Sequence, residues 1–275
     1  MRNRAFLCFP FFKEKAITFS YDDGVIYDKK LIEIFNKSGL KGTFNISTGL
    51  FGKGRILAKE DAIELYKNSC VEVAVHGYNH LSLARVDTAV ATNDVLQNRK
   101  ELEESFGRIV KGMAYANGHY NDAVKNILKN CGINYARTVA QTCEFNLPEN
   151  WLEWHPTCHH DNPKLMELAE SFINYKRPNY FWSYRPKVFY VWGHSYEFND
   201  KNNWDVIEKF AEYIGGREDV WDATNGEIYN YVNAYDNLEW SVDCSYVYNP
   251  TAVDVYINYF GNQFIIKSGQ TVQIN

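Results

Sequence analysis

Residues 13–39 read KEKAITFSYDDGVIYDKKLIEIFNKSG, and this stretch decides the fold. The β-prone apolar run at residues 15–21 predicts a buried strand. Apolar residues at helical spacing over residues 28–39 predict a helix that ends at a glycine. Two adjacent carboxylates, Asp22 and Asp23, stand where the strand ends. The segment is therefore a strand–helix unit with a charged pair at its turn.

The same alternation of strand and helix continues along the chain. Further strands are predicted at residues 41–47, 71–75, 111–116, 134–139, 187–196 and 220–224. Further helices are predicted at residues 59–69, 87–106, 121–132, 165–175, 203–216 and 226–236. Strands separated by helices imply right-handed crossovers and a parallel sheet. This number of units favours an α/β fold closed into a distorted (β/α) barrel, with a doubly wound open sheet as the alternative.

The sequence pattern changes from about Leu238 onward. The remaining residues lack a helical period, alternate apolar with polar side chains and are broken by turn pairs such as Asn249-Pro250. We expect a small antiparallel β appendage that packs on the barrel, because about 40 residues make a marginal core alone. The predicted organisation is a barrel at residues 1–235 and a β-rich unit at residues 236–275.

Composition excludes several classes of partner. The formal charge of −5 over 275 residues gives no basic surface for nucleic acid or an anionic membrane. Residues 1–19 begin with basic residues and an apolar run, but they lack the small-residue cleavage site of a signal peptide. No stretch approaches the roughly 18 to 20 apolar residues of a membrane span. These features predict a cytoplasmic chain, and six cysteines without CxxC spacing predict reduced thiols.

The Asp22-Asp23 pair is the first candidate for chemistry. Catalytic residues of barrels of this class gather at the carboxyl ends of the strands, and the pair stands at such an end. Adjacent carboxylates in a confined site repel, so a cation or a proton must neutralise one of them. One aspartate would bind a divalent metal and leave the other free as a base. The alternative is an ordinary surface turn, which Asp-Gly also favours.

Two histidines form the second candidate. His76 and His80 follow the strand predicted at residues 71–75 and are four residues apart. If the chain turns helically there, both imidazoles project from one face and can bind one ion. Imidazole suits zinc-like ions, so the pair predicts a metal site. Two unrelated histidines are the alternative.

Later histidines are less informative. His194 follows an apolar strand and a glycine, which places it at a strand's carboxyl end, although a lone histidine is also a common structural residue. The aromatic segment at residues 151–161 contains His155 and His159 at a spacing of four. Pro156 disfavours a helical His155, so the two are not expected to share a face. We interpret this segment as the wall of a groove first and a source of ligands second.

These motifs together resemble the polysaccharide deacetylase family, carbohydrate esterase family 4. The resemblance runs through most of residues 15–233, with the motifs in the family's order. They are SYDDG at residues 20–24, the pair His76 and His80, and VWGH at residues 191–194.

The resemblance implies a role for each of these residues. Asp22 corresponds to the general base. Asp23, His76 and His80 correspond to the ligands of a divalent metal, and His194 corresponds to the catalytic acid. The metal implied is Zn, with Co, Ni or Fe as alternatives.

The chain departs from the family at two motifs. The third motif, usually Arg-Pro-Pro-Tyr-Gly, is replaced by AYANG at residues 114–118, so the arginine that tunes the base is missing there. A backbone N–H, that of Asn117, remains to stabilise an oxyanion. Trp154 and His155 are the nearest replacement for the aspartate-tryptophan pair of the fourth motif. Tyr115, Trp154 and His155 are expected to contact substrate.

The function predicted from this resemblance is removal of N-acetyl groups from acetylated saccharides by metal-activated water. An acetylated oligosaccharide or a small amide is the expected substrate. An O-acetyl sugar esterase and an allantoinase-like amide hydrolase share the fold and remain alternatives, as does a non-catalytic carbohydrate-binding protein. The sequence does not set the oligomeric state.

Overall fold

The computed structural model of the chain describes residues 5–68, 70–177 and 184–274. Three parts of earlier predictions lie outside these residues: residues 1–4 of the N-terminal segment, residue 69 of the helix predicted at 59–69, and residue 275 of the C-terminal unit.

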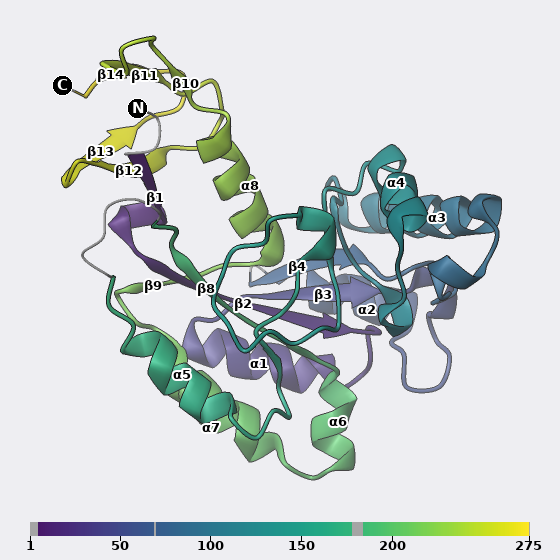
Figure 1. Cartoon of the computed structure of the whole chain (residues 1–275). Coiled ribbons are helices and arrows are strands. Elements are labelled where there is room, and N and C mark those ends of the chain that lie inside the picture. The colour runs from purple at the N-terminus through teal and green to yellow at the C-terminus, as the bar shows by residue number, and fades with distance from the viewer. Residues whose placement is uncertain (1–4, 69, 178–183, 275) are drawn as a thin grey trace.

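A curled parallel sheet forms the centre of the fold (Figure 1). Its strands lie in the order β6-β5-β4-β3-β2-β8-β7, and β9 pairs with β2. All of these pairings are parallel. Their bounds are β2 (Lys15–Asp22), β3 (Gly42–Ile46), β4 (Val71–Val75), β5 (Gly112–Ala114), β6 (Tyr135–Arg137), β7 (Cys158–His159), β8 (Lys187–Gly193) and β9 (Val220–Asp222). The predicted parallel sheet, curled into a distorted (β/α) barrel, is confirmed.

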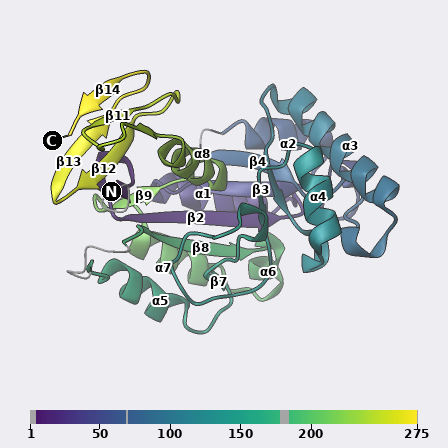
Figure 2. The same cartoon turned by 45° about the horizontal axis from the view of Figure 1, so that its top comes forward.

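Helices pack on both faces of this sheet, and the last of them in the chain lies on the inner face, where Asn225 accepts a hydrogen bond from Thr18. They are α1 (Asp28–Ser38), α2 (Lys59–Tyr66), α3 (Thr88–Phe106), α4 (Asp122–Asn130), α5 (Leu165–Ile173), α6 (Ser195–Asp200), α7 (Trp204–Ile214) and α8 (Asn225–Asp236). Short 3₁₀ turns are η2 (Pro10–Phe12), η3 (Thr48–Leu50), η4 (Leu83–Arg85), η5 (Ala116–Gly118) and η6 (Trp151–Glu153). Figure 2 shows α2, α3 and α4 gathered at one end of the molecule, opposite the strands β12 (Val255–Tyr259), β13 (Asn262–Ile266) and β14 (Thr271–Gln273).

The two faces of strand β2 have different roles: the outer face packs in the hydrophobic core, and the inner face leads to the candidate site. Its side chains alternate between two faces, because successive residues of a strand point to opposite sides. Phe19 lies on the outer face, where its ring centroid is 4.6 Å from that of Phe35 in α1. Thr18, Ser20 and Asp22 occupy the other face, and all three are buried. The inward face of the central strand is therefore polar and ends in a carboxylate.

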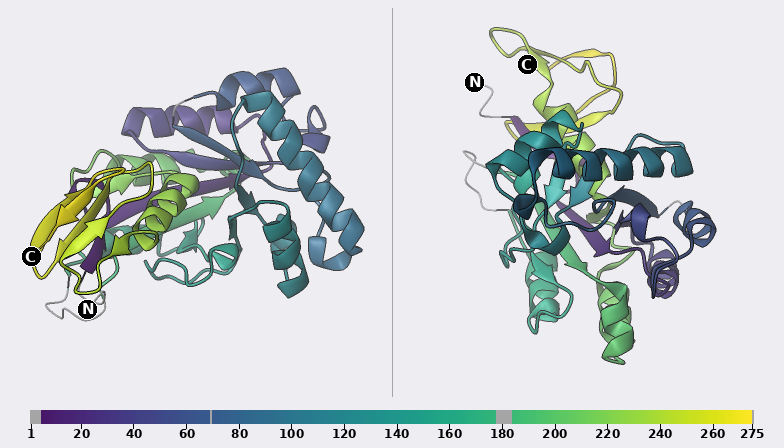
Figure 3. Two further views of the ribbon diagram at one scale, coloured as in Figure 1. Left: turned by 90° about the horizontal axis from the view of Figure 1, so that it is seen from above. Right: turned by 90° about the vertical axis from the view of Figure 1, so that its right-hand side faces the viewer.

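The C-terminal part forms two small antiparallel sheets, as the alternating pattern predicted. One contains β12 (Val255–Tyr259) and β13 (Asn262–Ile266), and the other contains β10 (Glu239–Trp240), β11 (Tyr246–Tyr248) and β14 (Thr271–Gln273). The first sheet also takes β1 (Ala5–Cys8), which pairs with β12. Figure 3 shows this purple strand beside the yellow C-terminal strands. The appended unit therefore draws on both ends of the described chain, whereas the predicted boundary at residue 235 placed β1 in the barrel.

One predicted strand ends earlier than its apolar pattern implied. The strand predicted at residues 187–196 stops at Gly193, and α6 begins at Ser195. The carboxylate of Glu197 accepts the backbone N–H of His194 at 3.4 Å, which satisfies a donor at the start of this helix. His194 thus lies at the junction between β8 and α6.

Two other features concern the environment of the chain. None of the described helices combines the length and apolar composition needed to span a bilayer. All six cysteines are free thiols in the structure, and five of them are buried.

Candidate active site

The predicted site residues converge at the carboxyl edge of the parallel sheet. Asp22 is the last residue of β2, and Asp23 follows it. His76 follows the end of β4, and His194 follows the end of β8. Because parallel strands end at a common edge, residues from three distant segments meet there.

Asp23, His76 and His80 form a cluster of ligand atoms. Oδ1 of Asp23 lies 3.6 Å from Nε2 of His76 and 3.4 Å from Nε2 of His80. The two imidazole rings have centroids 4.7 Å apart. One carboxylate and two imidazoles at this spacing suit a zinc-type ion and leave further coordination positions open.

The surroundings of His76 prepare it as a ligand. Its Nδ1 donates to the carbonyl oxygen of Ala114 at 2.9 Å, which leaves the lone pair of Nε2 facing Asp23. Burial lowers the pKa of His76 and outweighs the opposing effect of Asp22 and Asp23, so the ring is neutral. A hydrogen bond from the far ring nitrogen to a carbonyl is the usual way to orient a metal-binding histidine.

The backbone at the site is held in an uncommon conformation. Asp23, His80 and Asn117 have φ values of 78°, 55° and 58°, in the left-handed region that non-glycine residues rarely occupy. Gly77 has a φ of 79°, and a Cβ there would lie 2.5 Å from a carboxylate oxygen of Asp94. This explains why a glycine stands between the two histidines.

Asp22 lies beside the cluster in a buried set of hydrogen bonds. Its Oδ1 accepts from Nδ2 of Asn45 at 2.8 Å, and its Oδ2 accepts from Nη2 of Arg137. Burial raises the pKa of Asp22, but the charge of Arg137, helped by His76 and His194, outweighs it and lowers the pKa below its ordinary value. The carboxylate therefore stays ionised although it is only 3% exposed.

His194 faces both aspartates. Its Nε2 lies 3.9 Å from Oδ2 of Asp22 and 4.0 Å from Oδ2 of Asp23. Its Nδ1 lies 3.6 Å from Oε1 of Glu197. Burial lowers the pKa of His194, but Glu197 and then the two aspartates outweigh burial and raise the pKa. The ring thus keeps its proton to a higher pH than a free imidazole does.

Asn117 lies in η5, next to the loop that carries His80. Its side-chain amide donates to Oγ of Ser82 at 3.1 Å. This contact ties the turn that replaces the third motif to the segment just after the second histidine.

The predicted substrate-binding aromatics are placed differently. Tyr115 and Trp154 are each only 1% exposed, and the hydroxyl of Tyr115 donates to the carbonyl oxygen of Leu152 at 2.8 Å. Neither ring offers a face to a ligand, because both fill the interior, so we leave them out of the proposed site. His155 is partly buried, contacts Thr138 Oγ1 at 2.6 Å, and lines a hollow of about 830 Å³ that also includes Lys187 at the start of β8.

The sequence interpretation missed three residues around Asp22 and His194: Asn45, Arg137 and Glu197. Arg137 is the strongest omission, because it supplies the positive charge that the altered third motif lacks. A charged residue inside the short apolar strand predicted at residues 134–139 was the available signal. Glu197 stands three residues after His194, at the third position of α6. A glutamate at this position is typical of a capping box, which is the signal that could have identified it.

The family comparison agrees with this geometry. The profile of the family described as polysaccharide deacetylase matches residues 12–136. The match covers a little under half of the chain and shows that this segment is similar to the polysaccharide deacetylase family. The matched deacetylase segment contains Asp23, His76 and His80, whereas His194 lies beyond it. The predicted resemblance is confirmed.

Solved structures show where this fold recurs. A protein of Mycobacterium smegmatis assigned as a polysaccharide deacetylase is 17% identical, with a TM-score of 0.61 over 84% of this chain and 94% of that chain. A mutant of BA3943 from Bacillus anthracis, a CE4 family pseudoenzyme with restored activity, is 14% identical, with a TM-score of 0.51 over 82% and 70%. The Streptococcus pyogenes deacetylase PplD in complex with acetate is 23% identical, with a TM-score of 0.42 over 44% and 55%.

The first two likenesses extend the shared fold beyond residues 12–136. At such identities the first two show a common fold. The chain spans about half the length of PplD, as the 55% coverage states. A search of the curated proteins finds no match. Because a shared fold at these identities does not establish activity, the case for activity in this chain depends on its own site residues.

Proposed function

We propose that the chain is a metal-dependent deacetylase that removes N-acetyl groups from acetylated saccharides. The observation that carries the proposal is the convergence of Asp23, His76 and His80, whose ligand atoms lie within 4.8 Å of one another, with the carboxylate of Asp22 beside them. Asp22 accepts a hydrogen bond from Asn45 and is not one of these three ligands. The match of residues 12–136 to the polysaccharide deacetylase family supports the reaction class.

Asp23, His76 and His80 would hold the divalent cation, and Zn²⁺ fits them best. The neutral His76 presents a lone pair, and its far nitrogen is fixed on Ala114. When bound, such a cation would polarise the acetyl carbonyl and make a water molecule a stronger acid.

Asp22 would act as the general base. It is ionised because Arg137 lowers its pKa, and it faces the same space as Nε2 of His194. Asp22 would take a proton from the attacking water. Its hydrogen bonds to Asn45 and Arg137 fix its orientation, which a general base requires.

His194 would act as the general acid. Departure of an amine from the tetrahedral intermediate needs a proton, because an amide anion is a very poor leaving group. The raised pKa keeps a proton on the ring, and Glu197 faces Nδ1 on the side away from the aspartates. The backbone N–H of Asn117 is proposed to donate to the developing oxyanion.

An acetate-release assay tests this function. The purified chain, depleted of metal and then supplied with Zn²⁺, is incubated with N-acetylated chitooligosaccharides, O-acetylated xylooligosaccharides or a cyclic ureide. Zn²⁺-dependent acetate release from the first substrate, absent in Asp22→Asn, supports the proposal. Preference for the second substrate would make the chain an O-acetyl esterase, and ring opening of the third would make it an amide-ring hydrolase. Binding without turnover of any substrate would overturn the enzymatic assignment.

A further inference from the structure

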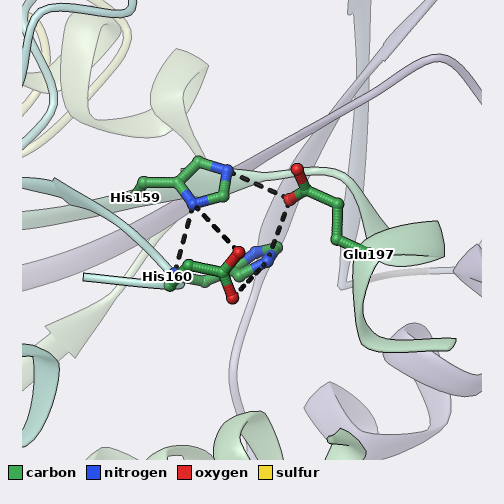
Figure 4. A group of neighbouring side chains, drawn as sticks. His159, His160 and Glu197 are labelled. Atoms are coloured by element: carbon green, nitrogen blue, oxygen red, sulfur yellow. Dashed lines mark hydrogen bonds and ion pairs between the residues drawn. The ribbon is translucent and has the colours of Figure 1, made fainter. Parts of the chain in front are cut away.

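We propose that His159, His160, Asp161 and Glu197 form a second binding site for a zinc-type divalent cation. It is separate from the cluster around Asp23. These four side chains come from β7, the turn after it and α6, and each offers one ligand atom within 4.8 Å of the others. Figure 4 shows the two imidazoles and the Glu197 carboxylate turned toward a common point.

Three of the ligand atoms have the spacing of a metal site. Oε2 of Glu197 lies 3.1 Å from Nε2 of His159 and 3.0 Å from Nε2 of His160. Ligands at zinc-like bond lengths of about 2.0 to 2.1 Å in a tetrahedron lie roughly 3.3 Å apart. Oδ1 of Asp161 lies 3.5 Å from Nε2 of His160 and completes a set of four. Two imidazoles with two carboxylates favour a zinc-type ion over Mg²⁺ or Ca²⁺.

His160 is the observation that points most directly to a ligand. Its side chain is fully buried, yet neither ring nitrogen has a hydrogen-bond partner among the described residues. The contact of Nε2 with Glu197 has the length of a hydrogen bond but lacks its direction. A buried polar nitrogen left unpaired is costly, and metal coordination at Nε2 would remove that cost.

Packing holds the His160 ring in place. The ring stacks on that of Phe198 in α6, with centroids 4.0 Å apart. It also stacks on the ring of Tyr21 in β2, with centroids 5.7 Å apart. A Cβ at Gly193 would lie 2.0 Å from its Nδ1, so only glycine permits this position. The nitrogen that faces Glu197 is therefore preset before any ion binds.

His159 can take part after one proton moves. Its Nδ1 accepts the backbone N–H of Asp161 at 3.2 Å, so the neutral ring carries its proton on Nε2, toward Glu197. Cation binding at Nε2 would shift that proton to Nδ1, which would end the hydrogen bond from the Asp161 backbone N–H, and the charge of Asp161 Oδ2, 3.9 Å from Nδ1, would favour the shift. Lys201 also pairs with that Asp161 oxygen, which makes Asp161 the weakest of the four ligands.

Metal counting tests the site without reference to activity. The full chain is dialysed against Zn²⁺ alone, and bound metal is measured by elemental analysis. We expect two equivalents in the wild type and one in both His159→Asn and Glu197→Gln, which change partly exposed side chains and spare the buried His160. His119→Asn is the matched control, because His119 bonds to Ser82 and Arg85 instead and should keep two equivalents.

The outcomes separate this site from the proposed catalytic one. His80→Asn should also lose one equivalent, and His80→Asn combined with His159→Asn should lose both. If His80→Asn keeps two equivalents while His159→Asn loses one, the catalytic cluster is misassigned and the second site stands. A wild type that saturates at one equivalent, or variants at His159 and Glu197 that keep two, would overturn the second site. Anomalous diffraction at the zinc edge from Zn²⁺-soaked wild-type crystals gives the same answer if a variant does not fold, since a peak among these four side chains is required.

Discussion

The guanidinium of Arg137 and the carboxylate of Asp22 form a buried ion pair, with side chains only 1% and 4% exposed. Arg137 ends β6, about one strand–helix unit after the segment at residues 114–118 where the family carries its arginine. Its guanidinium also lies over the Trp192 ring, 4.3 Å from the centroid. The chain thus provides a positive charge beside the proposed base from a different strand.

Arg137→Gln should raise the pKa of Asp22, because it removes the main charge that opposes burial. Activity on the acid side falls when Asp22 gains a proton, so the acid limb of the kcat/KM profile should move to higher pH. Breaking a buried pair by removing one partner also costs about 3–5 kcal/mol of stability. A pH–rate profile and urea unfolding measure the two effects.

The double variant Asp22→Asn with Arg137→Gln serves as the control. With both charges removed, the free energy of unfolding should recover part of the loss seen for Arg137→Gln. An acid limb that stays in place in the single variant would contradict the role given to Arg137.

Asp22→Asn and His194→Ala should each lower kcat by roughly 10² to 10⁴ while metal binding and the fold are kept, because both would move protons and neither would hold the cation. Steady-state acetate release, with metal content and circular dichroism measured on the same samples, checks this. Turnover close to the wild type in either variant removes that residue from its proposed role.

Asp23→Ala and His80→Ala should lose both activity and one equivalent of zinc, because each removes one of three ligands. Metal analysis after dialysis against a weak chelator is the measurement. Full retention of zinc in both variants would show that the ligand set is wrong.

Glu197→Gln should lower the pKa of His194, since the contact with the Glu197 carboxylate is the largest of the effects that raise it. His194 must carry a proton to act, so activity is lost as pH rises through its pKa, and the alkaline limb of the profile should move to lower pH. Asp200→Asn, on the same helix but paired with Arg55 at the surface, is the matched control and should leave that limb unchanged. Equal shifts in both variants would exclude a specific effect of Glu197.

Asp28 should make stability depend on pH. Burial raises its pKa to about 7, although Ser195 and Tyr66 donate hydrogen bonds to it and partly oppose this. The folded state then binds more protons than the unfolded state between about pH 4 and 7, so stability falls as pH rises through this window, by at most about 1.4 kcal/mol per pH unit. Asp28→Asn should flatten this part of the curve in urea unfolding at several pH values. A slope as steep as the wild type's would show that another group causes it.

The sequence predicted most of the barrel because its signals are local. The helix predicted at residues 87–106 is observed as Thr88–Phe106, and the strand predicted at residues 71–75 has the same bounds in the structure. Period, capping glycines and turn residues act within a few neighbours, so one sequence is enough to read them. The rule that parallel strands end at one edge placed the aspartate pair and the two histidines at the same rim, and the resemblance to the deacetylase family grouped Asp23 with His76 and His80.

The remaining features depend on contacts between distant segments. The partnership of Arg137 with Asp22 requires the curl of the sheet, which no local pattern specifies. The burial of Tyr115 and Trp154 could not be read either, because an aromatic residue beside a motif has the same local signature in the core as in a groove. Strand β1 was missed for the same reason, because its apolar run becomes a strand of a sheet only by pairing with β12, which is far away in the sequence.

The pairing of β1 with β12 has a consequence for biosynthesis. The ribosome releases Leu7 almost the whole length of the chain before Ile257, its partner in the register. Until then the apolar side chains of β1 have no sheet to join, and an unpaired strand edge of this kind is prone to misassembly. Strand β12, which is translated long after β1, therefore shelters it, and chains interrupted shortly before residue 255 should depend most on chaperones.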